Sequence, residues 1–553
     1  MGQATVLAYG GVTVSASGGQ SGDALFRIQQ QLSAASAAGT LVVNTPPATT
    51  VVGTKASPIL IPQPSAPGSG TVQVITIPDA DTGYISVPAG YTTILYNGPG
   101  TIIAGPGQQV IGDLFATGGA STVIGGGIGG RISDTTSGAF LGLLSGNYTI
   151  NSQGDAQTVE IQNKVKFNLN LTGSGSTVNI GLPNSTVASQ LRGSDFATVS
   201  GNNDTINMWA QENATFIVQP GATGTVFNSI GNSYNPGTIV TLLLDNGASV
   251  TAGQGNLIVY DSVGTAMTFD GSGNSALTYI FDSVGGGHIT TGDTTLYVND
   301  SAAAAASITG HSGSNDTVYA FHGVNYDGTQ ATSLLLVGGT DASTGANTVA
   351  AAANTTIWGG AAGGTYSIGG GSFFFGGAAG ASDTLVESSL SGSGSSFFAY
   401  SNSNEQLTLT SVTGASGNGV NIVVAGDQTT VDATNGAGGD NIWLLGISAS
   451  TVAGANALTG AATINGATAG GEHFVLYMDN TVEAAHTITV NNWQGSDNFD
   501  LLHAVGTGSD NYLQADVAAI SAFNAGASGN SFTLSDGTTV TFQGGQPTHI
   551  TLF

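Results

Sequence analysis

The sequence contains no cysteine and very few basic residues. Without cysteine, the chain cannot form disulfides, thiolate zinc sites or iron–sulfur clusters. Six Lys and Arg residues stand against 33 Asp and Glu residues, which gives a formal net charge of −27 at pH 7. Binding to phosphate groups requires many Lys and Arg residues, and this chain has only six. The composition therefore excludes nucleic acid and anionic membrane surfaces as partners.

Long apolar stretches are also missing. The sequence has no run of about 20 apolar residues, so it predicts no membrane span. Residues 1–20 lack a basic start and a continuous apolar segment, and we therefore expect no conventional N-terminal signal peptide. The hydrophobic fraction of 40% is nevertheless sufficient for a folded core.

The few basic residues are unevenly distributed along the chain. All six lie at or before Arg192, so residues 193–553 contain neither Lys nor Arg. Carboxylates in that part of the chain have no nearby cation in the sequence. They must be solvated, hydrogen-bonded to backbone N–H groups, protonated, or bound to metal ions.

The chain instead contains 87 glycines and many very short β-type runs. Residues 177–180, 257–260 and 441–444 are examples, and such runs recur about every 10 residues between turns rich in Gly, Asn, Asp and Ser. β-Branched and aromatic residues favour strands, whereas Gly, Asn and Asp favour turns. The pattern predicts an all-β protein.

An internal repeat indicates how these strands are organised. The segment Val259–Gly264 (VYDSVG) matches Ile280–Gly285 (IFDSVG) at an offset of 21 residues, and a weaker copy surrounds Asp300. A period of about 20 residues with two short strands is typical of one coil of a β-solenoid or β-roll. A sandwich or barrel of ordinary hairpins is the alternative. The repeat favours the solenoid, which we expect over residues 111–490.

The two ends of the chain differ from this central region. The pattern of residues 1–56 predicts a strand, a helix after Asp23 and a second strand. This segment is a candidate element for joining neighbouring molecules. Residues 57–70 form a Pro-rich linker and residues 71–110 a β entry segment. Residues 491–553 are expected to form a C-terminal cap, with a helix at Ala515–Asn524 and a hairpin of Ser531–Leu534 with Thr538–Phe542.

Residues Asn435–Trp443 (NGAGGDNIW) resemble the calcium-binding nonapeptide of repeats-in-toxin proteins, except that Asn replaces the first Gly. The segments around Asp510 and, more loosely, Asp497 match its later positions, and residues 534–553 resemble the tails of such proteins. The resemblance implies a glycine-rich β-roll, export by type I secretion through an uncleaved C-terminal signal, and a location at the bacterial cell surface. In that family the motifs occur in tandem, whereas here they are isolated.

Calcium is the metal ion that this resemblance implies. The candidate ligands are Asp440, Asp497 and Asp510, together with Asp261 and Asp282 from the internal repeat, which would stack about 5 Å apart in a solenoid. Because Ca²⁺ prefers six to eight oxygen ligands, a single Asp turn supplies too few. The alternative for each of these residues is a hydrogen-bonded Asx turn.

The sequence contains no recognisable catalytic motif. It has no zinc-protease helix, no nucleophile elbow and no phosphate-binding Walker loop, and none of the seven histidines is paired at metal-ligand spacing. Stacking in a solenoid can still bring distant carboxylates together, as a glycosidase would need. We therefore assign no catalytic or cofactor-binding residue and do not expect an enzyme.

Three functional classes remain. Small side chains and repeated coils favour an extracellular structural protein of a bacterial surface that self-assembles into a filament, matrix or surface layer. The first alternative is an adhesin or polysaccharide-binding module, with tryptophans as sugar platforms unless they pack in the core; these are Trp209, Trp358, Trp443 and Trp493. The second alternative is a carbohydrate-active β-helix enzyme.

Overall fold

The computed structural model describes most of the chain after residue 121. Before that point it describes the strands up to β10 and residues 30, 37 and 38. The residues after 121 that it does not describe are 126–128, 145, 162–164, 181–194, 209–213, 231–238, 254, 274–277, 299–303, 342, 344, 352–354, 369–371, 377–380, 388–397, 402–405, 412–420, 425–428, 436–438, 446–460, 480–486, 505–510, 536 and 553.

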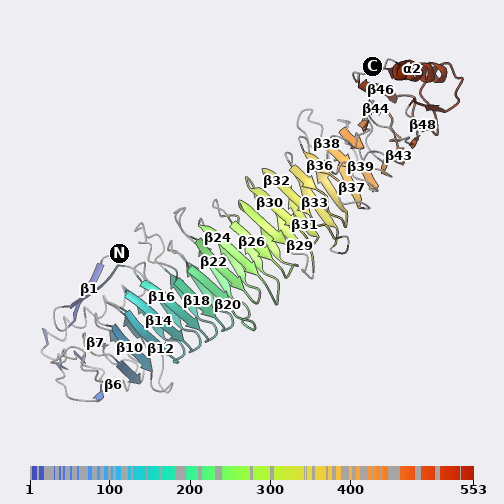
Figure 1. Cartoon of the computed structure of the whole chain (residues 1–553). Helices are drawn as coiled ribbons and strands as arrows, with labels where there is room; N and C mark the ends of the chain where they lie inside the picture. Colours follow the sequence, from blue (N-terminus) through green and yellow to red (C-terminus); the bar gives the residue numbers. More distant parts are fainter. Residues whose placement is uncertain are drawn as a thin grey trace. The chain divides into compact units, whose positions relative to one another are not determined.

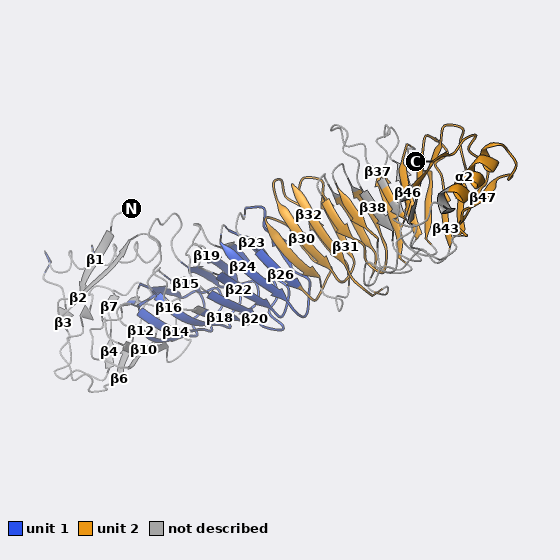
Figure 2. Ribbon diagram, turned by 45° about the horizontal axis from the view of Figure 1, so that its top comes forward, with its two compact units in different colours: residues 1–281 blue, residues 282–553 orange. Residues whose placement is uncertain are grey.

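The fold is a parallel β-solenoid, as the internal repeat predicts, and the hairpin sandwich is not formed. Each coil contributes one strand to each of two sheets, so even-numbered strands pair with even-numbered strands and odd with odd, except at the two ends of the chain (Figure 1). The chain divides into two compact units, residues 1–281 and residues 282–553, which are described separately below (Figure 2).

In the first unit, the even sheet contains parallel strands that each pair with the next even strand along the chain. They are β4 (Thr50–Val52), β6 (Val72–Thr76), β8 (Thr93–Asn97), β10 (Gln108–Asp113), β12 (Gly129–Asp134), β14 (Gly146–Ser152), β16 (Val165–Leu171), β18 (Asp195–Val199), β20 (Ala214–Val218), β22 (Ile239–Leu244) and β24 (Asn256–Asp261).

The odd sheet of the first unit is built in the same way. Its strands are β3 (Val42–Val43), β5 (Ile59–Leu60), β7 (Tyr84–Ser86), β9 (Thr101–Ile103), β11 (Thr122–Gly125), β13 (Phe140–Leu143), β15 (Thr158–Ile161), β17 (Thr177–Ile180), β19 (Thr205–Met208), β21 (Val226–Ile230), β23 (Ser249–Ala252) and β25 (Thr268–Asp270).

The second unit repeats this two-sheet arrangement. Its even strands are β28 (Thr294–Val298), β30 (Asn315–Ala320), β32 (Ser333–Gly338), β34 (Thr355–Trp358), β36 (Phe373–Phe375), β38 (Phe398–Ser401), β40 (Asn421–Val424), β42 (Asn441–Leu445), β44 (His473–Asp479), β46 (Asn498–Ala504) and β49 (Thr551–Leu552). Its odd strands are β27 (His288–Thr290), β29 (Ala306–Thr309), β31 (Val324–Gly328), β33 (Asn347–Ala351), β35 (Gly364–Ile368), β37 (Ser382–Glu387), β39 (Gln406–Ser411), β41 (Thr430–Asn435), β43 (Ala461–Asn465), β45 (Thr487–Asn491) and β48 (Thr539–Phe542). Strand β26 (Thr278–Asp282) crosses the boundary between the units.

The core lies between the two sheets of each unit. Alternate residues of each strand point inward, and parallel pairing stacks them in rows. One row of the first unit runs Ile132, Ile150, Leu169, Ala197, Phe216, Leu242 and Val259, all of them buried. The small Ala197 lies beside the large Phe216, whose ring contacts Phe227 of the opposite sheet edge to face, with ring centroids 5.6 Å apart. Alternating large and small side chains fills the space between the sheets.

The helix and the hairpin expected near the C-terminus are both present, close to the predicted positions. Helix α2 spans Asn511–Asn524, so it begins four residues earlier than expected; Ile520 and Phe523 are buried, whereas Val517 is exposed. Strand β47 (Ser531–Thr533) pairs antiparallel with β48, which confirms the hairpin. Phe523 of the helix packs against Phe532 and Phe542 with ring centroids 5.4 and 5.7 Å apart, so the cap covers the apolar interior of the last coil.

The N-terminal region differs in detail from the sequence prediction. The first β segment is a hairpin of two strands, β1 (Gln3–Ala8) and β2 (Val12–Ser17), and the expected helix lies outside the described residues except for Gln30, which is helical. Strand β5 lies within the predicted Pro-rich linker, and pairing of even strands begins at β4 and β6, well before residue 111. The solenoid therefore includes the expected linker and entry segment, because short Val- and Ile-rich runs between the prolines still pair with the next coil.

Candidate functional site

Buried carboxylates are the most unusual chemical feature of the interior. Eleven carboxylate side chains among the described residues are buried: Asp134, Glu160, Asp204, Asp261, Asp282, Asp316, Asp383, Asp440, Glu472, Asp497 and Asp516. Several of them accept hydrogen bonds from backbone N–H groups in turns. Asp134, for example, accepts one from Thr136 over 2.7 Å, and Asp516 accepts one from Ser535 over 2.8 Å. Such bonds compensate in part for the lack of cations in the sequence.

Three of these carboxylates fall at the same position in consecutive coils. Asn441 pairs with His473, and His473 pairs with Asn498, so the preceding residues Asp440, Glu472 and Asp497 stack at one corner. Backbone hydrogen bonds link the steps: His473 N–H donates to the Asp440 carbonyl and Asn498 N–H to the Glu472 carbonyl, both over 2.8 Å. The sequence motifs indicate Asp440 and Asp497 but not Glu472, because Glu472 belongs to no Asp-turn motif.

The carboxylates of this corner column bind the backbone around them. Asp497 Oδ1 accepts from Gly471 and Glu472 N–H over 2.8 and 3.1 Å, and its Oδ2 accepts from Gln494 N–H over 2.7 Å. Glu472 Oε1 accepts from Ala467 N–H over 2.8 Å. Within the described part of the chain, no group of three or more His, Asp or Glu side chains is arranged to hold a metal ion. The described contacts therefore fit turn-stabilising carboxylates better than calcium ligands.

The remaining calcium candidates that the structure describes each accept hydrogen bonds from nearby backbone N–H groups. Asp261 in the first unit accepts from Met267 N–H over 3.1 Å. Asp282 in the second unit accepts from Val284 and Gly285 N–H over 3.0 and 2.7 Å, which is the Asx-turn arrangement. Asp510 lies outside the described residues. Calcium binding at these positions stays a prediction.

Burial changes the titration of several of these groups. It raises the pKa of Asp204 to about 6; the Ser176 N–H hydrogen bond lowers this pKa, and the charge of Asp155 raises it. Burial also raises the pKa of Asp282, whereas its two backbone hydrogen bonds and the charge of His322 lower this pKa. The protonated form of each carboxyl is therefore favoured more strongly than in water.

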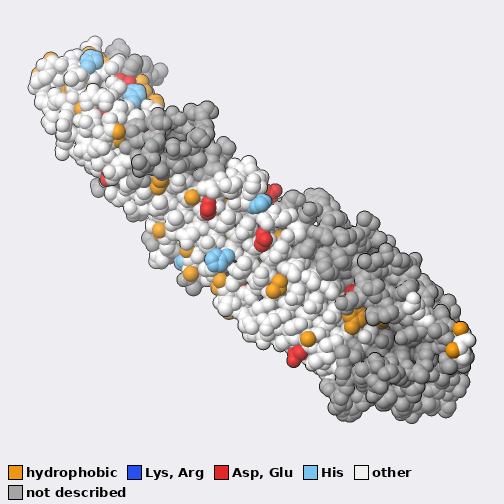
Figure 3. All heavy atoms as spheres, turned by 180° about the vertical axis from the view of Figure 1, so that it is seen from behind, with side chains coloured by type: hydrophobic (Ala, Val, Ile, Leu, Met, Phe, Trp, Pro, Cys, Tyr) orange, Lys and Arg blue, Asp and Glu red, His pale blue; other side chains and the backbone are white. Residues whose placement is uncertain are grey.

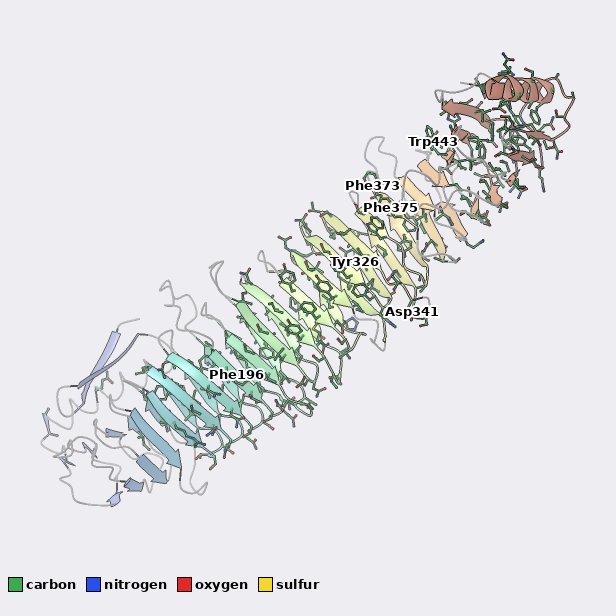
Figure 4. All side chains as sticks on the ribbon, viewed as in Figure 1. Phe196, Tyr326, Asp341, Phe373, Phe375 and Trp443 are labelled. Carbon is green, nitrogen blue, oxygen red and sulfur yellow. The ribbon has the colours of Figure 1, made fainter. Side chains whose placement is uncertain are left out.

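A compact hydrogen-bond network surrounds Asp316 in the second unit. Asp316 Oδ2 accepts from the hydroxyls of Tyr326, Thr291 and Ser314 over 2.7, 2.8 and 3.1 Å. Burial raises the pKa of Asp316, and these hydrogen bonds act in the opposite direction. Burial and the neighbouring carboxylate also raise the pKa of Tyr326, which points inward from β31 (Figure 4). The network joins strands of both sheets and is a structural crosslink.

The outer face of the even sheet in the second unit has a row of aromatic and aliphatic side chains. Strand register places Tyr297, Tyr319, Val337, Trp358 and Phe375 at equivalent positions in consecutive coils. The rings of Tyr297 and Tyr319 stack with centroids 4.6 Å apart and planes 3° apart, and those of Trp358 and Phe375 stack at 4.4 Å and 18°. Trp358 remains 50% exposed. Register continues this row to Trp443 on β42.

A parallel row lies two residues earlier on the same strands. It contains Thr295, Thr317, Leu335, Thr356 and Phe373, and Phe373 is 46% exposed. Phe373 and Phe375 leave β36 on the same side of the sheet (Figure 4). We call these two rows, from β28 to β36, the aromatic face. Sequence reasoning missed it because loops of unequal length hide the register between its members.

The outer face of the odd sheet is different in character. In the second unit its central row contains Asn325, Thr348, Thr365 and Thr384. In the first unit, side-chain amides form a ladder in which Asn207 donates to Asn179 over 2.9 Å and Asn228 donates to Asn207 over 3.0 Å. In the view of Figure 3, charged side chains are scattered singly and hydrophobic ones form small separate groups. Among the described strands, the exposed large hydrophobic side chains belong to the even sheet: Phe196, Ile239, Tyr260, Trp358 and Phe373.

The four tryptophans have different environments. Trp493 is buried in the cap, with its ring stacked on Phe474 at 5.6 Å, so it packs in the core rather than on a sugar-binding surface. Trp358 is exposed, Trp443 is half-buried on β42, and Trp209 lies outside the described residues.

No protein-family model matches the chain, and neither a curated protein nor a solved structure is significantly similar to it. No helix among the described residues is long and apolar enough to cross a membrane.

Proposed function

We propose that the protein is an extracellular structural component of a bacterial surface that assembles with copies of itself into a filament, matrix or layer. The observation that carries this proposal is the stacking of like side chains from coil to coil. Aliphatic rows fill the core, Asn179, Asn207 and Asn228 form an amide ladder, and aromatic rings stack outside. These contacts hold consecutive coils together, which is the requirement for a load-bearing element.

The location is supported by sequence rather than by geometry. The cysteine-free, acidic composition and the resemblance of residues 435–443 to repeats-in-toxin nonapeptides both suit an exported protein. The resemblance also supports type I secretion. Detection of the full-length protein in the medium, dependent on residues 491–553, would test this part of the proposal. Retention of the intact protein inside the cell would contradict it.

Polysaccharide binding is less well supported than self-assembly. A sugar ring packs on an aromatic side chain through the flat face of the ring. On the aromatic face, Tyr297 and Tyr319 cover each other's flat faces, as do Trp358 and Phe375, so these stacked pairs turn mainly ring edges toward solvent. An apolar surface of edges suits packing against another protein surface better than sugar stacking.

Electron microscopy and sedimentation of the purified full-length protein test the proposed function. We expect ordered polymers or sheets whose amount increases with protein concentration. A monomer at every concentration, with and without Ca²⁺, would contradict the assembly proposal.

Calcium is proposed separately, as an ion that stabilises the C-terminal coils. The described carboxylates do not form such a site by themselves, so the proposal depends on the repeats-in-toxin resemblance at Asp440, Asp497 and Asp510. If Ca²⁺ is bound, its removal by a chelator lowers the melting temperature, and added Ca²⁺ restores it. A melting temperature that is the same with chelator and with Ca²⁺ would remove calcium from the proposal, and Mg²⁺ serves as the control ion.

A further inference from the structure

The aromatic face is an exposed apolar surface on a regular sheet. Trp358 and Phe373 are about half exposed, and they lie in adjacent rows on neighbouring strands, β34 and β36. Contiguous apolar surface of this kind is uncommon on proteins that act alone and marks an interaction site. The first unit has a similar row, in which Ile217, Leu243 and Tyr260 share one register position and Tyr260 stacks on Phe281 at 4.8 Å.

The aromatic face also lacks charge, although the chain carries 33 acidic residues. From β28 to β36 its two rows contain only Thr, Tyr, Leu, Val, Trp and Phe. Along the same rows the first described carboxylate is Asp500 on β46, where His473 contacts it at 2.6 Å. A charged partner would find no counter-charge on this face. A second copy brings an equally uncharged face, so no charge is buried unpaired when the two meet.

The spacing of the rows also favours a second copy. Side chains of the aromatic face repeat once per coil, at the strand spacing of about 4.8 Å. Another copy of this chain presents the same rows at the same repeat, so the side chains of two such faces can interdigitate along several coils. Two sheets that pack face to face in this way lie about 10 Å apart.

We propose that the aromatic face of the second unit docks against the aromatic face of a second copy, in a two-fold symmetric, sheet-on-sheet contact. In such a contact each residue of the face meets an equivalent surface on the partner, so one patch serves both molecules. This inference rests on the proposed self-assembly and adds to it the surface through which the copies meet.

Charged substitutions on the two outer faces test the proposal in the full-length protein. Trp358→Asp and Tyr319→Asp each place a carboxylate on the aromatic face, and the two-fold contact would bury each of them against the uncharged face of the partner. Thr348→Asp and Thr365→Asp place the same charge at exposed positions of the odd sheet and are the matched controls. Trp358→Phe keeps an aromatic ring at the first position. Circular dichroism and thermal melting verify that each variant is folded.

Sedimentation equilibrium then gives the association constant. We expect the aromatic-face Asp variants to weaken association at least about tenfold, whereas the odd-sheet controls and Trp358→Phe associate like the unchanged protein. If the protein associates and the aromatic-face variants associate equally well, the proposed interface is wrong but the proposed function stands. If the unchanged protein is monomeric throughout, both fail. Binding of a neutral polysaccharide to a monomer, lost in Trp358→Asp, would replace the second copy with a glycan partner.

Discussion

At the residue scale, the chain keeps carboxyl groups in its interior, and several of them accept hydrogen bonds from backbone N–H groups. Asp204 shows the arrangement most clearly, because its side chain is buried, Oδ1 accepts the Ser176 N–H over 2.8 Å, and Oδ2 has no hydrogen-bond partner among the described residues. Burial disfavours the charged form and raises the pKa to about 6. Such a group makes the folded state bind protons more strongly than the unfolded chain.

The first prediction concerns the pH dependence of stability. The pKa of Asp204 in the folded state lies above its unfolded value of 3.8. Its contribution to the free energy of unfolding is therefore fully present below about pH 4 and is lost as the pH rises through about 6. We expect a higher melting temperature at pH 4.5 than at pH 7.5. Asp204→Asn keeps an oxygen for the Ser176 N–H and should reduce this difference. A melting temperature that rises steadily from pH 4.5 to 7.5 would contradict the prediction.

Asp341→Asn is the matched control for this experiment. Asp341 is exposed and accepts hydrogen bonds from Ser343 N–H and Oγ, both over 2.8 Å, which lower its pKa. Because its pKa is lowered in the folded state, Asp341 contributes to stability at higher pH, and this contribution is lost only at more acidic pH. The Asp341→Asn variant should therefore keep the pH dependence between pH 4.5 and 7.5.

The second prediction concerns the network at Asp316. Tyr326→Phe removes the hydroxyl that donates to Asp316 Oδ2 over 2.7 Å and leaves the ring in the core. We expect a loss of about 1–3 kcal/mol in the free energy of unfolding, because a buried acceptor loses one of its donors. Chemical denaturation measures this loss. Tyr319→Phe, on the aromatic face, should change the free energy of unfolding by less than about 0.5 kcal/mol, and equal losses in both variants would argue against a special role for the network.

At the element scale, the cap has a distinct task at the end of the last coil. Strand β48 pairs in parallel with β45, and β47 pairs antiparallel with β48. The parallel pairing of the odd sheet therefore ends in a hairpin. Helix α2 contributes Ile520 and Phe523, which are buried against this hairpin. The cap converts an open solenoid end into a closed surface.

The third prediction follows from this packing. Phe523→Ala leaves a cavity between Phe532 and Phe542. It should lower the free energy of unfolding of the C-terminal coils by about 3–5 kcal/mol. Because solenoid coils interact mainly with their neighbours, we expect the C-terminal coils to open first while more distant coils stay folded. Limited proteolysis should cleave near the C-terminus in this variant, and the exposed Val517→Ala is the control. Uniform cleavage along the chain would contradict local opening.

The elements also show what the sequence could predict. The repeat of VYDSVG and IFDSVG predicts a coil, and the runs Ser531–Leu534 and Thr538–Phe542 predict the hairpin, because both depend on neighbours close in the chain. The column of Asp440, Glu472 and Asp497 could not be predicted, because loops between their strands differ in length and only strand pairing defines the register. For the same reason, the aromatic face was not recognised from its scattered residues.

At the scale of the whole molecule, electrostatic repulsion opposes assembly. The net charge is −27, and no Lys or Arg occurs after Arg192 to offset it. Copies that meet through uncharged faces must still bring two strongly negative molecules together. Salt screens this repulsion, with a Debye length that falls from roughly 30 Å at 0.01 M to 10 Å at 0.1 M.

The fourth prediction is therefore that association strengthens as salt increases. We expect the mean mass measured by light scattering to rise between about 0.02 and 0.5 M NaCl, because screening lowers repulsion while apolar contacts are retained. Trp358→Asp should show a smaller rise at equal protein concentration. A mass that falls with salt would indicate that assembly depends on ion pairs instead.

The pairing of each strand with the next strand of its own sheet has a consequence for how such a chain can change over time. Asn168 pairs with Phe196, whereas Leu244 pairs with Asp261, so coils of quite different length keep the same register. A coil can therefore be duplicated, lost or lengthened without disturbing the contacts of distant coils. The number of repeats, and with it the reach of the molecule, is the property that such a gene can adjust most readily, while the terminal cap has to be kept.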